Sequence, residues 1–351
     1  MLKLNETPVR TAKNFKINNI KLDDNIIPRN VRSFENVDII NESSNIIIDN
    51  NVKFTKLNYG LGKDLENLNI QANQNINIEI NSKTNKNVYV NFEFDEDNLN
   101  LLDNIIITAN ENAKATVIIK YKSEANIKAF HNGIIRVNAI KNSNIKVILV
   151  NLLNNESNNF IAIENTLQEN AKVNYNMVDF GGKNSITNYY SNLIGNNSDN
   201  KLNTIYLGKD SQVFDLNYIG ELKGEKTNIN IEVQGALKDN AKKHFKGTID
   251  FKNGCKKAVG NENEACMLLS ENAKSLALPM LLCSEEDVEG NHSTSSGKIG
   301  EKELFYIMSR GFELKDAMKL LVRAKFNKIL ENIKDEELKE EFLQEIDKRL
   351  D

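Results

Sequence analysis

The sequence predicts a mainly β protein: a parallel β-helix (solenoid) followed by a C-terminal α-helical domain. Three observations support this prediction. Apolar and polar residues alternate through the middle of the chain, a short turn motif recurs there at a nearly constant interval, and an amphipathic helical pattern begins after Gly300. We therefore divide the chain into an N-terminal segment, residues 1–35, a β-helix core, residues 36–298, and a helical domain, residues 299–351.

The strands are predicted from alternation with a period of two. Ile76, Ile78 and Ile80 are separated by Asn77 and Glu79, and the same pattern runs through residues 228–234. Such a pattern places β-branched side chains on one face and polar side chains on the other, as in a half-buried strand.

The recurring turn motif has the form Glu/Asp-Asn-Ala-Lys, with looser versions. Its small residue stands at positions 113, 143, 171, 211, 241 and 273, which are 30, 28, 40, 30 and 32 residues apart. Asn and Asp tolerate the backbone conformations of tight turns, so each motif marks a corner that leads into a strand. Units of this length without a helix between strands favour a solenoid over a doubly wound sheet, while a β-sandwich remains an alternative.

Three helices are predicted in the C-terminal part. Residues 301–311 begin with acidic residues and end at Gly311, which suits a helix C-terminus. Apolar residues then recur every three or four positions between Leu314 and Ile333, and every four positions from Leu338 to Leu350. Helices attached to a solenoid end would serve as a cap, as a docking surface, or as both.

Composition limits the class of function. The 351 residues include 45 Lys+Arg and 49 Asp+Glu, a net charge of -4, which gives no drive toward nucleic acid or an anionic membrane. No signal-like apolar region opens the chain and no apolar run is long enough to span a bilayer, so we expect a cytoplasmic protein. The three cysteines, Cys255, Cys266 and Cys283, are expected to be reduced thiols.

Motifs of self-sufficient catalysis are missing from the sequence. None of its Gly-Lys pairs is followed by Ser or Thr, as a P-loop requires, and there is no Cys-x-x-Cys or His-Glu-x-x-His. With three histidines, a complete metal or iron–sulfur site within one chain is not expected. A β-helix polysaccharide lyase or hydrolase and a purely structural β-solenoid are the alternative functions.

Several segments in a fixed order resemble the SufB/SufD family of iron–sulfur cluster assembly proteins, in its SufD-like form. The segments are His244–Ile249, Met267–Ala273, Pro279–Leu282, His292–Ser295 and Leu304–Gly311, and the opening Pro8-Val9-Arg10-Thr11 is also similar. The resemblance implies a right-handed parallel β-helix with a C-terminal helical domain.

The resemblance also implies partners and cargo. Such a chain is a scaffold rather than an enzyme, docks a SufC-type ABC ATPase through its C-terminal helices, and packs its β-helix on a SufB-like protomer or on itself. No tightly bound cofactor is expected, only transient iron or an iron–sulfur cluster at the protomer junction.

Site residues are carried over from the resemblance by position. His292 stands at the family's histidine, a candidate cluster or iron ligand, with Cys266 and Cys283 as further candidates. Gly290 and Ser293 stand where family members carry Cys and Glu, and these departures favour a SufD-like member.

Four residues are expected to face the ATPase. They are Phe305, Tyr306, Arg310 and Gly311. Aromatic and arginine side chains are favoured at protein interfaces.

Overall fold

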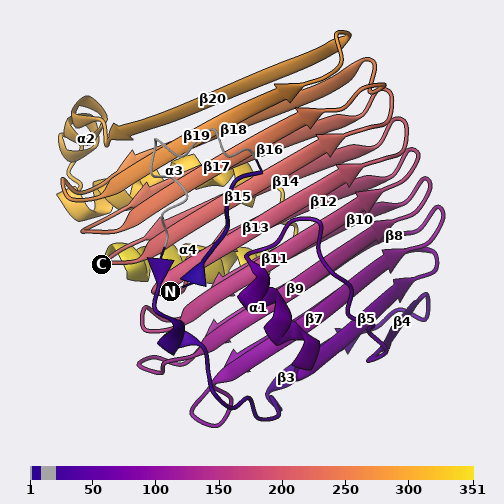
Figure 1. The fold of residues 1–351 in the computed structure, drawn as a ribbon. Coiled ribbons are helices and arrows are strands. Elements are labelled where there is room, and N and C mark those ends of the chain that lie inside the picture. Colours follow the sequence, from indigo (N-terminus) through magenta and orange to yellow (C-terminus); the bar gives the residue numbers. More distant parts are fainter. Residues whose placement is uncertain (1, 9–20) are drawn as a thin grey trace.

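The chain folds into a parallel β-solenoid with helices on its flanks, in a computed structural model that describes residues 2–8 and 21–351 (Figure 1). Two nine-stranded sheets face each other and enclose an apolar lumen. We name them after what covers their outer faces, as described below: the helix-side sheet and the strap-side sheet.

The helix-side sheet has the order β20-β18-β16-β14-β12-β10-β8-β6-β3. Its strands are β3 (Val37–Asn41), β6 (Lys83–Phe94), β8 (Lys114–Ser123), β10 (Asn144–Leu152), β12 (Lys172–Asp179), β14 (Asp199–Gly208), β16 (Asn228–Leu237), β18 (Ala258–Leu268) and β20 (Val288–Lys298).

The strap-side sheet has the order β19-β17-β15-β13-β11-β9-β7-β5-β4. Its strands are β4 (Ile46–Asp49), β5 (Gln74–Ile80), β7 (Asn100–Ala109), β9 (Phe130–Ala139), β11 (Asn158–Leu167), β13 (Asn184–Leu193), β15 (Val213–Leu222), β17 (Lys242–Phe251) and β19 (Lys274–Cys283).

The chain crosses from one sheet to the other after every strand from β5 to β20, and each strand pairs in parallel with the next strand of its own sheet. This connectivity confirms the predicted parallel solenoid and is not that of a β-sandwich. The first strands differ, since β3 and β4 pair antiparallel with β6 and β5. The domain boundaries at residues 35 and 298 stay a prediction.

The turn motif marks two different corners of the solenoid. Ala113, Ser143 and Ala171 precede strands of the helix-side sheet, whereas Ala241 and Ala273 precede strands of the strap-side sheet. The 40-residue interval is therefore one coil plus half of the next. At the corner before β15, the predicted small residue is not the buried one. Ser211 is exposed, and the buried residue is Gln212, whose Nε2 donates to the Gly182 carbonyl at 2.7 Å.

The C-terminal helices are α2 (Glu301–Met308), α3 (Leu314–Leu330) and α4 (Glu336–Leu350). The last two pack on the outer face of the helix-side sheet, where Val322, Phe326, Phe342 and Ile346 join apolar side chains of β8 to β16 in a second core. Of the two roles expected for these helices, capping the solenoid end is wrong for α3 and α4, and docking a partner stays a prediction.

An N-terminal strap, Leu2–Pro8, lies on the outer face of the opposite sheet, together with helix α1 (Lys63–Leu68) (Figure 1). Leu2 and Leu4 are buried there beside Leu65 and Phe130. Strand β1 (Leu2–Lys3) pairs with β2 (Lys21–Leu22), and 3₁₀ turns follow at Asp24–Ile26 and Asn69–Gln71. Val9, Arg10 and Thr11 of the predicted opening motif lie outside the described residues.

Both outer faces are thus covered in the middle of the solenoid. Strands such as β9, β11 and β13 are consequently buried on both faces, as strands of parallel sheets usually are. No helix in the described part of the chain is long and apolar enough to cross a membrane.

Candidate functional site

The solenoid is open at the end formed by β19 and β20, which are the edge strands of the two sheets. In β18 the buried residues Gly260, Glu262, Glu264 and Cys266 alternate with less buried ones, so this set faces the lumen. Because paired residues of parallel strands point to the same side, the lumenal residues of β20 are those paired with this set: Gly290, His292, Thr294 and Ser296. All four are exposed.

His292 therefore combines an inward direction with an exposed ring. It is paired with Glu262 on the neighbouring strand, and the residue is exposed. Its place at the open end suits a residue that meets a partner or a cargo, although its role as a ligand stays a prediction.

The two candidate cysteines lie at different depths. Cys266 is paired with Ser296, four residues beyond His292, and is only 5% exposed. Burial raises the pKa of its thiol, which weakens it as a nucleophile. Cys283 ends β19, is exposed, and lines a hollow of about 680 Å³ with Phe251, Leu281 and Val288.

The structure does not bring His292, Cys266 and Cys283 into one cluster. Strands rise about 3.3 Å per residue, so four residues separate His292 from the level of Cys266 by about 13 Å. Cys283 lies at the opposite end of β20, where the hollow beside it reaches Val288 and Gly290. Within residues 2–8 and 21–351, no three His, Cys, Asp or Glu side chains are placed to hold one metal ion.

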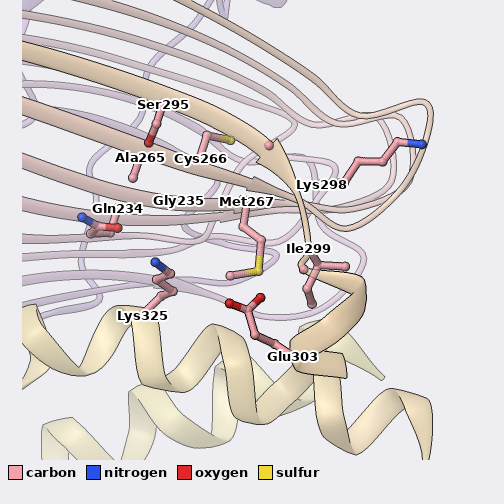
Figure 2. A pocket seen from close by; sticks show the side chains of 12 residues that line it. Gln234, Gly235, Ala265, Cys266, Met267, Ser295, Lys298, Ile299, Glu303 and Lys325 are labelled. Carbon is pink, nitrogen blue, oxygen red and sulfur yellow. The ribbon is translucent and has the colours of Figure 1, made fainter. Parts of the chain in front are cut away.

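A cavity of about 240 Å³ lies on the other side of β18, between the helix-side sheet and helices α2 and α3. Figure 2 shows Met267, Glu303 and Lys325 pointing into this space, while the sulfur of Cys266 points away from it. The cavity is therefore an outer pocket, and the thiol of Cys266 belongs to the lumen.

Sequence reasoning missed the charged residues of the lumen near the open end. Lys243 of β17 and Glu264 of β18 form a fully buried ion pair, with Nζ 2.7 Å from Oε1, and the Tyr206 hydroxyl donates to the same oxygen at 3.2 Å. The ammonium also lies 5.8 Å from the centre of the Phe245 ring. A pair of this kind satisfies two charges that the apolar lumen would otherwise exclude.

Glu262 has no such partner. Its side chain is 2% exposed, and neither carboxylate oxygen has a hydrogen-bond partner among the described residues. Burial, together with the nearby Glu264, raises the pKa of Glu262 to about 8. Residues two apart along a strand share a face, as Glu262, Glu264 and Cys266 do, but nothing in the sequence says that this face is the inner one.

An aromatic patch marks α2 and the turn that follows it. Phe305 and Tyr306 are 75% and 59% exposed, and Met308, Phe312 and Leu314 are exposed beside them. Arg310 lies over the Tyr306 ring, 5.2 Å from its centre. Gly311 has a φ of +98°, which favours glycine and reverses the chain toward α3. Exposed apolar patches of this kind mark interaction sites.

Comparison of the sequence with known proteins points to one family. The family model "SUF system FeS cluster assembly, SufBD core domain" matches residues 92–325. The chain is 23% identical over 265 residues to the iron–sulfur cluster assembly protein SufD of Bacillus subtilis, and 25% identical over 241 residues to that of Escherichia coli. It is 30% identical over 154 residues to an iron–sulfur cluster assembly SufBD family protein of Pyrococcus horikoshii.

The alignments cover much of this chain but less of its relatives. They include 75%, 68% and 43% of this chain, and 60%, 57% and 33% of the proteins from B. subtilis, E. coli and P. horikoshii. The matched region begins within β6 and ends within α3, so it includes the open end, the lumenal charges and the aromatic patch. The chain belongs to the SufB/SufD family and is a SufD-like member of it.

Proposed function

We propose that this chain is a non-catalytic scaffold subunit of an iron–sulfur cluster assembly complex. One observation carries the proposal: the last coil exposes its lumenal side chains, and β19 and β20 each keep an unpaired edge. Solenoids need an atypical terminal repeat to cover such an end, and an uncovered strand edge readily pairs with another chain. A SufB-like protomer, or a second copy of this chain, would cover the end.

The aromatic patch supports the second partner, a SufC-type ABC ATPase. Phe305 and Tyr306 stand on a short helix that projects beside the open end, and Arg310 adds a positive charge (Figure 1). Large exposed aromatic side chains next to an arginine have the composition of an interface hot spot. ATP hydrolysis by the docked partner would then move a helix next to the protomer junction.

Iron or a nascent iron–sulfur cluster would be the cargo at that junction, and no resident cofactor is proposed. His292 is the candidate ligand that would face the covering protomer. Cys266 lies deeper in the lumen, and Cys283 lies at the end of β19, beside the start of β20. Because these residues lie apart, a complete site would need ligands from the second protomer. The chain would act in the cytoplasm, where its free thiols stay reduced.

The docking proposal is tested by mixing the full chain with a SufC-type ATPase and measuring complex formation by size exclusion, with and without nucleotide. We expect a complex that the double substitution Phe305→Ser and Tyr306→Ser abolishes. The matched control is Ile70→Ser, which removes another exposed apolar side chain and should leave the complex intact. A wild-type chain that forms no complex in either nucleotide state would contradict the proposal.

A further inference from the structure

Glu262 is a buried carboxyl group without a partner, close to the open end of the lumen. Within residues 2–8 and 21–351, neither of its oxygens has a hydrogen-bond partner, and its side chain is 98% buried. A buried acceptor left in this state costs free energy, and a carboxyl group costs more than a neutral one. An apolar residue would fit this lumenal position without that loss of free energy. The presence of a carboxyl group there therefore indicates a role in binding.

The wall opposite Glu262 offers it no donor side chain. It faces Gly247 of β17, where an added Cβ would lie 2.1 Å from Oε2, and Gly247 is paired with Pro279 of β19. The Lys243 ammonium, which is buried in the same lumen, is held by Glu264. Glu262 therefore extends into space that glycine leaves free, and no positive charge of the described part of the chain is bound to it.

The missing partner would enter from the open end, where His292 is the next side chain in line. Glu262 and His292 are paired in register on adjacent strands and point to the same side. Adjacent strands lie about 4.8 Å apart. A metal ion about 2.1 Å from each of two ligand atoms can bridge atoms about 4.2 Å apart, so the spacing of the two side chains suits a shared ion.

We propose that Glu262 and His292 together bind one divalent cation of the ferrous class at the open end of the solenoid. Carboxylate and imidazole ligands suit iron and manganese in their divalent states. Two ligands from this chain leave the remaining positions to water or to the covering protomer, in agreement with the absence of a three-residue site among the described residues. The inference rests on the proposed function in naming iron as the cargo, and it adds Glu262 as a residue that holds it.

The experiment measures binding of Mn²⁺, a stand-in for Fe²⁺, to the full chain by the loss of the free-ion signal in electron paramagnetic resonance. We expect one Mn²⁺ per chain, and at least tenfold weaker binding in both Glu262→Gln and His292→Ala. Glu262→Gln keeps the shape of the side chain, and its melting temperature verifies the fold. Glu289→Gln removes an exposed carboxylate from the outer face of β20 and should leave Mn²⁺ binding unchanged.

Two results would overturn the inference: Mn²⁺ binding that Glu262→Gln does not weaken, or a wild-type chain that binds no Mn²⁺. In either case a basic side chain of the covering protomer would become the better candidate for the partner of Glu262. The same preparations are then mixed with the SufC-type ATPase. If the complex forms while Mn²⁺ binding fails, the ion site alone is wrong and the scaffold function stands.

Discussion

Lys243 and Glu264 lie in the lumen as a charged pair, whereas most of the residues around them are apolar. Taking two charges out of water is costly, and their attraction repays this only when both are present in good geometry. The Tyr206 hydroxyl and the two flanking rings improve that geometry. The pair should therefore be sensitive to the loss of one member and tolerant of the loss of both.

Replacing Lys243 alone tests this view. Lys243→Met leaves the Glu264 carboxylate buried without its cation, and we expect a loss of about 3–5 kcal/mol in the free energy of unfolding by urea. The double variant Lys243→Met and Glu264→Leu should regain most of the loss. Lys86→Met, which breaks the exposed pair between Lys86 and Glu42, should have no measurable effect. Equal losses in the single and double variants would refute the argument.

Glu262 predicts a pH dependence of stability. Its ordinary pKa of 4.5 is raised to about 8 by burial and by Glu264, and His292 is paired in register with it on the neighbouring strand. Between these values the unfolded chain loses the proton and the folded chain keeps it. Stability should therefore fall as pH rises from about 4.5 to about 8, by up to roughly 1.4 kcal/mol per pH unit.

Urea midpoints of the wild type and of Glu262→Gln across this pH range measure the effect. The variant cannot ionise, so its midpoint should fall less steeply with pH, and the two curves should separate most at the alkaline end. Glu289→Gln is the matched control because it removes an exposed carboxylate. Parallel curves for Glu262→Gln and the wild type would show that the carboxyl group ionises normally in the fold.

The candidate site could be predicted in part at this scale. The resemblance singled out His292, Cys266 and Cys283. The separation of these residues was not visible in the sequence because distances along a solenoid depend on which strands pair. The role of Lys243, Glu262 and Glu264 was hidden for a different reason. Alternation assigns residues to two faces, and charged residues are usually assigned to the outer one.

At the scale of the element, the N-terminal strap is held by a few polar contacts. Asn5 adopts a φ of 54°. Its side-chain Nδ2 donates to the Thr187 carbonyl at 3.1 Å and to Asp215 Oδ1 at 2.6 Å. The buried Lys246 ammonium binds the Asn5 carbonyl and Asp215 Oδ1, each at 2.6 Å. One residue thus ties the strap to strands β13, β15 and β17.

Asn5→Gly isolates this contribution, because glycine accepts the positive φ and removes the side chain. The loss of hydrogen bonds to buried groups should cost about 1–3 kcal/mol and speed amide hydrogen exchange in residues 2–7. Asn51→Gly, in an exposed position, is the control. An unchanged exchange rate in the strap would mean that Leu2 and Leu4 hold it without the polar contacts.

The elements were predictable where a regular period exists. The three C-terminal helices follow from spacing and end signals, and the structure has them close to the expected bounds. Their docking on the flat face of a sheet was not predictable, because an apolar stripe shows that a helix is covered but not by what. The strap has no period at all, and its position depends on contacts more than 180 residues away in sequence.

At the scale of the whole molecule, the repeat interval predicted coils and the structure has them. Alternation alone could not separate a solenoid from a sandwich, because both place two sheets face to face with apolar side chains between them. The difference lies in the order of the strands. The interval of the turn motif favoured the solenoid, since one coil of about 30 residues carries a strand of each sheet. The 40-residue interval is longer because the motif moves there from the corner before the helix-side strands to the corner before the strap-side strands.

The open end is the feature of the whole molecule on which the scaffold function depends. The most direct test measures molar mass by light scattering for the full chain, alone and mixed with a SufB-like protomer. We predict a dimer, with itself or with that protomer, and its loss in Thr294→Lys, which puts a charge on the exposed lumenal face of β20. Ile47→Lys, at the other end of the solenoid, should still dimerise. A chain that stays monomeric in both mixtures, or a dimer that Thr294→Lys leaves intact, would contradict the account.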